Sequence, residues 1–228
     1  MRVVIMGGTS GIGLAAAQKL SQDGAEVIVT GRDERKLSAV PAEVAVAERV
    51  DGTSPDAVAA FMEQTGKFEH LVLAFSQGAR GFGQLRELDL ETLRSVFEGK
   101  TIPYLIAIQQ AQVTESITLI SGSSARGGDS GTAVLAASNG AIERAVSPLA
   151  AELAPVRVNA VCPGVTDTSW WSFLDDQERS AQFKTIGDAL PAGRVGRPEE
   201  VAEAIHYLIG ATYVTGQVLP VNGGLTVA

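Results

Sequence analysis

The stretch GGTSGIG, residues 7–13, contains the first side chains and backbone groups that could do chemistry. Its glycines permit a tight turn and let a pyrophosphate approach the backbone, and amide N–H groups that open a helix point at negative charge. The spacing therefore predicts a phosphate-binding loop, and the alternative is a glycine-rich loop that serves only to reverse the chain. The residues expected to contact the cofactor here are Gly7, Thr9, Ser10, Gly11, Ile12 and Gly13.

The stretch TGRDERKL, residues 30–37, bears on which dinucleotide is bound. An acidic side chain at a strand tip binds the ribose hydroxyls of NAD, whereas an arginine just beyond the tip can neutralise the 2′-phosphate of NADP. Here Gly31 is followed by Arg32, which favours NADP(H). Asp33 either pairs with Arg32 or caps the short helix that follows, and Arg32 could instead be a solvated loop charge.

Strand-like and helix-like runs alternate along the whole chain, which is the pattern of a parallel sheet with helices on both faces. Helices are expected from Ile12, over 54–65, from about Leu90 to Gln112 with a bend at Pro103, from about Ala133 to Glu152, and over 197–209. Strands are expected at 3–6, 25–30, 43–50, 70–75, 116–121, 156–162 and 216–221. The sequence therefore predicts one doubly wound Rossmann domain, residues 1–228, with about seven strands. Residues 168–197 are long for a connection and predict a substrate lid.

Composition excludes several classes of protein. Hydrophobic residues make up 45% and charged residues 19%, which is ordinary for a globular domain and too interrupted for a spanning helix. The net charge of −8 argues against nucleic acid or an anionic membrane as the main partner. The single cysteine cannot form an internal disulfide, and no signal peptide is visible, so we expect a cytoplasmic protein.

Three later segments give this fold a more specific identity. They are RVNAVCPGVTDT at 157–168, GRVGRPEEVAEAIHYLI at 193–209 and VTGQVLPVNGG at 214–224. Together with GGTSGIG, they resemble the short-chain dehydrogenase/reductase family over essentially the whole chain. The resemblance implies NAD(P)H, hydride transfer to or from a carbonyl or alcohol, and a homodimer or homotetramer paired through the helices near 90–112 and 133–152. It also implies roles for Asp51 beside the adenine, for Ser76 and Gly78 along the cofactor, for Pro163, Gly164 and Thr166 around the nicotinamide, and for Ser123 in the active site.

The departures from that family are equally specific. The family's Tyr-x-x-x-Lys pair falls at Leu135 and Asn139, in a register fixed by the family-like sequence that continues from Asn139. The family's tyrosine is the acid or base at the substrate oxygen, and its lysine lowers the tyrosine pKa and binds the nicotinamide ribose. Leu135 can do neither, whereas Asn139 can hydrogen-bond ribose hydroxyls. Lys100 stands where the family often has asparagine, so Lys100 and Asn139 look like an exchange across one site, unless Lys100 is a solvated helix charge.

Ser123, Lys100 and Asn139 are therefore the candidate catalytic residues. Ser124 is a near rival of Ser123, and Tyr104, one helical turn beyond Lys100, is the tyrosine to test as a substitute. The remaining notable side chains have simpler interpretations: Cys162 is core packing, His70 and His206 are structural rather than metal ligands, and Trp170 and Trp171 form either a lid or an oligomer contact.

The leading functional hypothesis is an NADP(H)-dependent oxidoreductase with an altered active site and a small-molecule substrate. One alternative is a cofactor-binding sensor or scaffold without turnover. A second alternative is a redox-neutral isomerase or lyase on the same fold. Loss of a proton donor is compatible with residual catalysis, because positioning contributes independently of acid–base assistance.

Overall fold

Seven parallel strands form the centre of the computed structural model, which describes residues 1–227. Their order in the sheet is β3-β2-β1-β4-β5-β6-β7, so the direction of winding reverses between β1 and β4. The strands are β1 (Arg2–Met6), β2 (Glu26–Gly31), β3 (Val46–Arg49), β4 (Lys67–Leu73), β5 (Gln112–Ile120), β6 (Arg157–Pro163) and β7 (Val218–Val221). This arrangement confirms the predicted doubly wound sheet.

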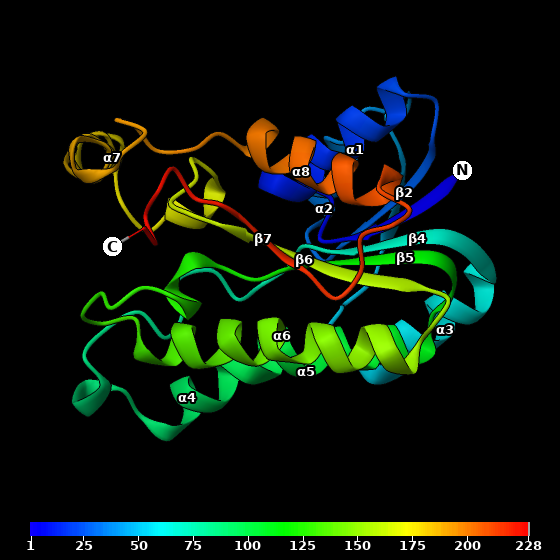
Figure 1. The fold of residues 1–228 in the computed structure, drawn as a ribbon, viewed down its shortest axis with the longest axis horizontal. Coiled ribbons are helices and arrows are strands. Elements are labelled where there is room, and N and C mark those ends of the chain that lie inside the picture. Colours follow the sequence, from blue (N-terminus) through cyan, green and yellow to red (C-terminus); the bar gives the residue numbers. More distant parts are fainter. Residues whose placement is uncertain (228) are drawn as a thin grey trace.

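Helices cover both faces of the sheet, because each crossover between parallel strands must pass over one face. Figure 1 shows α1 and α8 on one face and α5 and α6 on the other. The helices are α1 (Gly11–Gln22), α2 (Glu34–Ser38), α3 (Pro55–Thr65), α4 (Leu90–Val96), α5 (Ile102–Gln110), α6 (Ala133–Glu152), α7 (Asp176–Ala189) and α8 (Pro198–Gly210). Within residues 1–227, none of them is both long and apolar enough to cross a membrane.

Strand β1 shows why its sequence is a continuous apolar run. Val3 and Ile5 pack into the core beneath α1 and α8, whereas Val4 and Met6 pack into the core on the opposite face. All four are fully buried. Successive side chains of a strand point to opposite faces, and a sheet covered on both faces therefore needs apolar residues at every position.

The predicted long helix over 90–112 is present as one unbroken run of helical backbone over residues 90–110, but its form changes within that run. The structure has α4, then a π turn at Phe97–Thr101, then α5, and residue 112 already belongs to β5. Pro103, the predicted position of a bend, lies two residues beyond the π turn and inside the same helical run, so its missing N–H leaves one helical carbonyl without its usual partner. The irregularity in this run is the π turn, which adds one residue to a helical turn at the position of Lys100.

Two other expectations change in extent. Strand β3 pairs only over Val46–Arg49 rather than 43–50, and β5 begins four residues earlier than expected. The segment 168–197 contains the fourteen-residue helix α7 rather than irregular chain. Asp175 and Glu178 form a reciprocal capping box that starts this helix.

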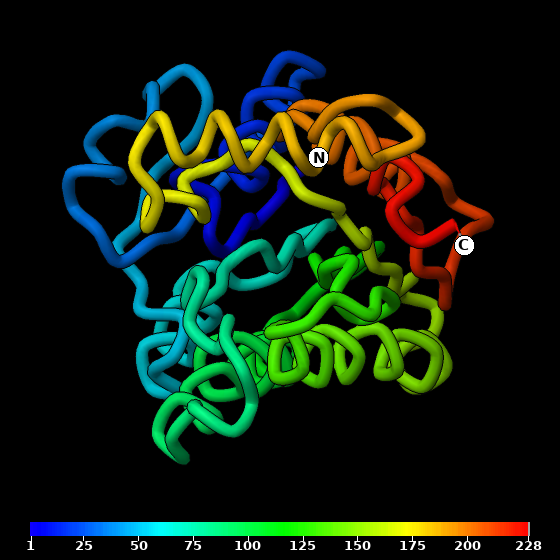
Figure 2. Tube along the Cα trace, turned by 90° about the vertical axis from the view of Figure 1, so that its left-hand side faces the viewer, coloured from blue at the N-terminus to red at the C-terminus, as the bar shows by residue number. Residues whose placement is uncertain are grey.

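The carboxyl ends of the strands meet at one edge of the sheet. Figure 2 faces this edge and shows the segment around α7, in yellow and orange, above the green and cyan loops that follow β4 and β5. Because the strands are parallel, the loop that follows each strand begins at this edge. In open α/β sheets, ligands bind at this edge, beside the point where the strand order reverses.

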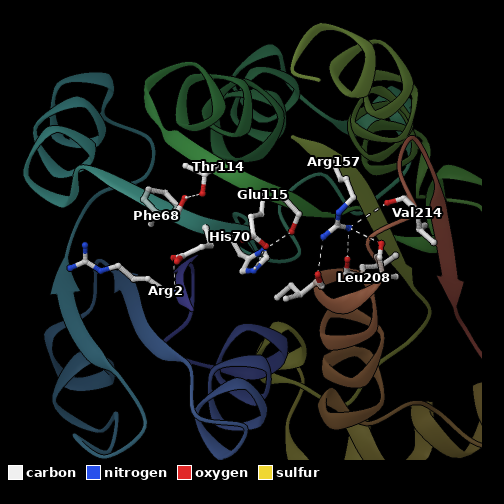
Figure 3. A network of polar contacts seen from close by, with 12 residues as sticks. Arg2, Phe68, His70, Thr114, Glu115, Arg157, Leu208 and Val214 are labelled. Carbon is white, nitrogen blue, oxygen red and sulfur yellow. Dashed lines mark hydrogen bonds and ion pairs between the residues drawn. The ribbon is translucent and has the colours of Figure 1, made fainter. Parts of the chain in front are cut away.

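Near the start of β6, Arg157 ties the sheet to the end of α8 (Figure 3). Its guanidinium donates to the carbonyl oxygens of Leu208 at 2.8 Å, Ile209 at 2.8 Å and Ala211 at 3.0 Å. The last carbonyls of a helix have no partner within the helix, and a cation beside them is favoured by the helix dipole. Arg157 therefore both satisfies and neutralises the end of α8.

His70 lies beside this network, buried on β4 (Figure 3). Its Nδ1 is 2.8 Å from Ser116 Oγ, and its Nε2 is 3.5 Å from a carboxylate oxygen of Glu115. Burial lowers the pKa of His70 below its ordinary value, despite the nearby carboxylate of Glu115. The ring is held on the sheet away from the carboxyl-end loops.

Replacing Arg157 by methionine should lower the free energy of unfolding by about 2–4 kcal/mol, because several charge-assisted hydrogen bonds to one helix end are lost together. Urea denaturation at neutral pH measures this difference. Arg49→Met is the matched control, since Arg49 has only an exposed ion pair with Glu34 and should change stability by less than about 1 kcal/mol. Equal stabilities for the two variants would contradict the role given to Arg157.

Candidate functional site

A cavity of about 1070 Å³ lies at the carboxyl edge of the sheet. Its lining combines the glycine loop after β1, the end of β2, and the loops after β3, β4, β5 and β6 with part of α7. The sequence-predicted residues that line it are Gly7, Thr9, Ser10, Gly11, Ile12, Arg32, Asp51, Ser76, Gly78, Lys100, Ser123, Asn139, Pro163, Gly164 and Thr166. Gly13 is the one predicted site residue that does not line the cavity.

Gly13 has a packing role instead of a lining role. A side-chain carbon built on Gly13 would overlap the carbonyl oxygen of Gly7, so only glycine allows α1 to lie so close to the end of β1. Gly7 itself has a φ of 84°, and a side chain there would lie 2.7 Å from the backbone nitrogen of Phe75. The glycine spacing is therefore a condition for bringing α1 to the cavity.

The N-terminus of α1 is open toward the cavity. Ser10 precedes the helix in an extended conformation, its side chain caps no N–H, and the first turn contains no acidic residue. Ser10, Gly11 and Ile12 all line the cavity. Uncapped N–H groups and the positive end of the helix dipole make an anion site, which fits a pyrophosphate.

Two cations lie at the end of the cavity formed by β2 and α2. Arg32 and Lys36 both line it, and neither side chain forms a hydrogen bond or ion pair with another residue in 1–227. Asp33 does not pair with Arg32, because its Oδ1 accepts from the N–H groups of Arg35 and Lys36 and caps α2. This resolves the two interpretations of Asp33 in favour of the cap. It leaves positive charge that fits an additional phosphate.

Asp51 lies after β3 on the same cavity. Burial opposes its ionisation, but hydrogen bonds from the backbone N–H and the hydroxyl of Thr53 outweigh it and lower the pKa of the carboxyl, helped by the charge of Arg32. The carboxylate is therefore ionised and fixed in direction. It can accept hydrogen bonds from a ligand at this end of the cavity.

Lys100 reaches into the middle of the cavity from the π turn. Its ammonium donates to Asn139 Oδ1 at 2.7 Å and to the carbonyl oxygen of Ser121 at 3.0 Å. Both acceptors are neutral, and Lys100 forms no ion pair with a carboxylate among the described residues. Burial lowers the pKa of Lys100 to about 8. The solvated-helix interpretation of Lys100 is therefore wrong.

Asn139 is buried on α6 and is held at both ends of its amide. While Oδ1 accepts from Lys100, Nδ2 donates to Ser124 Oγ at 3.0 Å. One N–H and one lone pair of the amide remain for a ligand. Asn139 thus acts first as the side chain that orients Lys100.

The three serines after β5 have different surroundings. Ser121 donates its hydroxyl to Glu143 at 2.9 Å, and Ser124 accepts from Asn139. Ser123 lines the cavity, and its hydroxyl has no hydrogen-bond partner within residues 1–227. Of the three, Ser123 is therefore the one whose hydroxyl has no partner in this range, whereas Ser124 keeps its O–H donor for a ligand.

Leu135 and Tyr104 complete the centre of the site. Leu135 lines the cavity from α6, one turn before Asn139, and carries no proton to give. Tyr104 is buried, and its hydroxyl donates to the carbonyl oxygen of Phe75 at 3.1 Å. Burial raises the pKa of Tyr104 well above its ordinary value, so it holds its proton and supports the loop after β4.

The remaining candidates do not belong to the chemistry of the cavity. Cys162 is fully buried, and burial raises the pKa of its thiol to about 12, which fits core packing. His206 Nε2 lies 2.7 Å from a carboxylate oxygen of Asp23, which caps the C-terminal end of α1. Within residues 1–227, no three histidine, cysteine or acidic side chains gather as metal ligands would.

Sequence reasoning missed many of the lining residues, and Lys36 and Gln77 are two examples. Lys36 lies on α2, just after the loop that carries Arg32, and the nearby basic residues of RDERK could have indicated a second cation. Gln77 lies against Gly99 of the π turn, where any side chain at residue 99 would overlap it. No local signal could have found Gln77, because the contact joins segments far apart in the chain.

The comparisons with known proteins agree with this geometry. A family model described as enoyl-(acyl carrier protein) reductase matches residues 7–226. Short-chain dehydrogenase/reductase ATR9 of Stachybotrys chlorohalonatus is 32% identical, covering 97% of this chain and 95% of that protein. Cis-4-hydroxycyclohexanecarboxylate dehydrogenase of Sinomonas cyclohexanicum is 33% identical, covering 98% and 95%.

Among solved structures, a small-chain dehydrogenase in complex with NADPH superposes with a TM-score of 0.87 at 29% identity, covering 100% of this chain and 99% of that one. The match to the family model spans nearly the whole sequence, and the fold and the position of the cavity are those of a dinucleotide-binding enzyme. This chain therefore belongs to the short-chain dehydrogenase/reductase family of oxidoreductases.

Proposed function

We propose that this protein is an NADP(H)-dependent oxidoreductase that acts on a carbonyl or alcohol substrate with Lys100, Ser123 and Asn139 as its catalytic group. The observation that carries the proposal is the Lys100 ammonium, held in the cavity by Asn139 at 2.7 Å with no carboxylate partner. In the usual family pattern, a tyrosine and a lysine stand where this chain has Leu135 and Asn139.

The cavity has a group for each part of NADP(H). The N-terminus of α1 suits the pyrophosphate, Asp51 the adenosine end, and Arg32 with Lys36 the 2′-phosphate. The solved relative with bound NADPH supports this choice of cofactor. When bound, NADPH supplies the hydride that reduces a carbonyl carbon.

The chain's own residues would handle the substrate oxygen. Ser123 has a hydroxyl free to donate to that oxygen. Two N–H groups of Lys100 are taken by Asn139 and Ser121, which leaves the third to donate to the substrate and to transfer its proton as negative charge develops there. Asn139 is expected to keep Lys100 in this direction through its own hydrogen bond with Ser124.

Arg32→Ala should weaken the binding of NADPH by about 10–100-fold and that of NADH by less than about threefold, because only the former carries the 2′-phosphate. Fluorescence titration of both cofactors measures the difference. Arg35→Ala is the matched control, since Arg35 lies three residues beyond Arg32, on α2, but does not line the cavity. Equal affinities of the parent protein for NADPH and NADH would contradict the preference.

Lys100→Met and Ser123→Ala should each lower turnover by about 10²–10⁴-fold while NADPH affinity stays within about threefold of the parent. Reduction of a panel of ketones and aldehydes, followed as loss of NADPH, measures this. Lys67→Met is the control, because Lys67 is exposed at the start of β4. Normal turnover in both site variants would reject the assignment, and a cofactor-binding sensor replaces it if no carbonyl ever consumes NADPH.

The pH dependence of reduction should follow Lys100. An acid must be protonated to act, and the pKa of Lys100 is about 8, so turnover should be level below pH 8 and fall about tenfold per pH unit above it. Lys100→Arg should remove this fall at the cost of a lower plateau, since a guanidinium stays protonated throughout. A parent profile without a decrease above pH 8 would contradict the role of Lys100 as the acid.

We further propose that the chain forms a homodimer or homotetramer through α4, α5 and α6. Leu90 on α4 and Ile102 and Leu105 on α5 leave 60%, 46% and 45% of their surfaces exposed. Exposed apolar side chains on neighbouring helices indicate a surface that another copy of the chain covers. Light scattering at micromolar concentration should give two or four times the mass of one chain. Leu105→Glu should shift the mixture toward monomer, and a parent that is monomeric from the start would contradict the interface.

A further inference from the structure

Three aromatic rings form one side of the cavity beyond Lys100. Trp170, Trp171 and Phe173, which we call the aromatic wall, all line it. The ring centroids of Trp170 and Trp171 are 4.8 Å apart at 69°, and those of Trp171 and Phe173 are 5.8 Å apart at 30°. These are the edge-to-face and near-parallel arrangements that aromatic rings prefer. The wall is therefore one connected aromatic surface.

The aromatic wall is held in place by the protein itself. Trp171 donates its indole N–H to the carbonyl oxygen of Thr166 at 3.2 Å, and its ring meets Phe183 of α7 edge-on at 5.5 Å. Thr168 caps the turn that carries both tryptophans. A surface that is ordered before the ligand arrives loses less conformational freedom on binding.

The opposite side of the cavity contributes apolar side chains as well, among polar ones such as Gln77, Arg80 and Asp129. Phe82, Val96 and Leu135 line it from the loop after β4, from α4 and from α6. These elements lie below the segment around α7 in Figure 2. Leu135 removes from this side the polar group that a tyrosine would place there. The space between the two sides therefore favours a flat, apolar body.

Charge along the cavity is confined to other regions. From residue 163 onward, no lining side chain within the described chain is charged. The cations and carboxylates belong to the cofactor end, to the outer loops with Arg80 and Asp129, and to Lys100 at the centre. A charged group on the body of the substrate would lose its hydration here without gaining a partner. Outside the cofactor end, the charged lining side chains are thus Arg80, Asp129 and Lys100, and the proposed function puts only Lys100 at the reacting oxygen.

We infer that the substrate is an uncharged planar aromatic ketone or aldehyde, whose ring system lies against the aromatic wall while its carbonyl oxygen meets Ser123 and Lys100. This inference rests on the proposed function. A flat ring gains the directional contacts with Trp170 and Phe173 in addition to area burial, whereas a flexible chain gains area burial alone and loses rotational freedom.

The two tryptophans provide a direct readout, because they are the only tryptophans of the chain and both belong to the wall. The probes are 2-acetylnaphthalene and 2-dodecanone, an aromatic and a straight-chain ketone with the same number of carbon atoms. Each is titrated into protein saturated with NADP⁺, so that binding is read as quenching of tryptophan emission without turnover. Free N-acetyltryptophanamide treated in the same way corrects for light absorption by the probe.

The aromatic ketone should quench saturably and bind at least tenfold more tightly than 2-dodecanone. Phe173→Leu keeps both tryptophans and an apolar side chain, and Phe173 is 50% exposed, so this variant should fold. This variant should bind 2-acetylnaphthalene about threefold to tenfold more weakly than the parent does, and its affinity for 2-dodecanone should stay within about twofold. Tyr213→Leu, which changes a fully exposed aromatic residue outside the cavity, should alter neither affinity.

Equal or tighter binding of 2-dodecanone would overturn the inference in favour of an aliphatic substrate. The inference would also be overturned if 2-acetylnaphthalene gave no saturable quenching. Loss of NADPH upon addition of 2-acetylnaphthalene is measured separately. Tight binding without NADPH consumption would keep the aromatic wall as the ligand site and reject the proposed reduction of this ligand. Consumption with other carbonyls but no aromatic preference would keep the function and reject the substrate class.

Discussion

Gly13 and the carbonyl of Gly7 lie so close together that no side chain fits between them, and this contact places α1 against the end of β1. This contact sets the direction of the α1 dipole and turns the uncapped N–H groups of α1 toward the cavity. It also places α1 where it packs on α8. The glycines are thus required twice, once for the turn and once for the distance between helix and strand. The remainder of the site is arranged around the anion position that this contact creates.

Ser121 separates the positive charge of Lys100 from the negative charge of Glu143 in the centre of the site, because it hydrogen-bonds both. Its carbonyl oxygen accepts from Lys100, while its hydroxyl donates to Glu143, whose carboxylate also accepts from Arg126 at 2.8 Å. The carboxylate of Glu143 is therefore compensated by Arg126 and hydrogen-bonded to Ser121, rather than paired with Lys100. An ammonium that faces only neutral acceptors has its pKa lowered by desolvation, which for Lys100 gives a pKa of about 8.

Local patterns predicted the parts of the fold and of the site that depend on local physics. The apolar run of β1, the N-cap and proline of α3, and the glycine loop each carry their cause within a few residues. The capping box that starts α7 was also present in the sequence, but only Gly187 of that helix is buried, so no apolar stripe marked it. The π turn differs in one respect: Gln77 of another loop packs over Gly99 within it, and this contact joins segments far apart in the chain. For the same reason, a contact of Lys100 with Asn139 is expected only from the family resemblance, and only the structure gives the distance of 2.7 Å between their polar atoms.

Helix α7 has one buried residue, Gly187, yet it supports the aromatic wall through Phe183. Its free energy of local opening is therefore low compared with that of the sheet, since few apolar contacts break when it swings away. Opening of this helix would expose the far end of the cavity without disturbing the glycine loop or the Lys100–Asn139 contact. In such an arrangement, release of the product can be slower than the chemical step, and the rate of the enzyme is then set by how often one weakly anchored helix detaches.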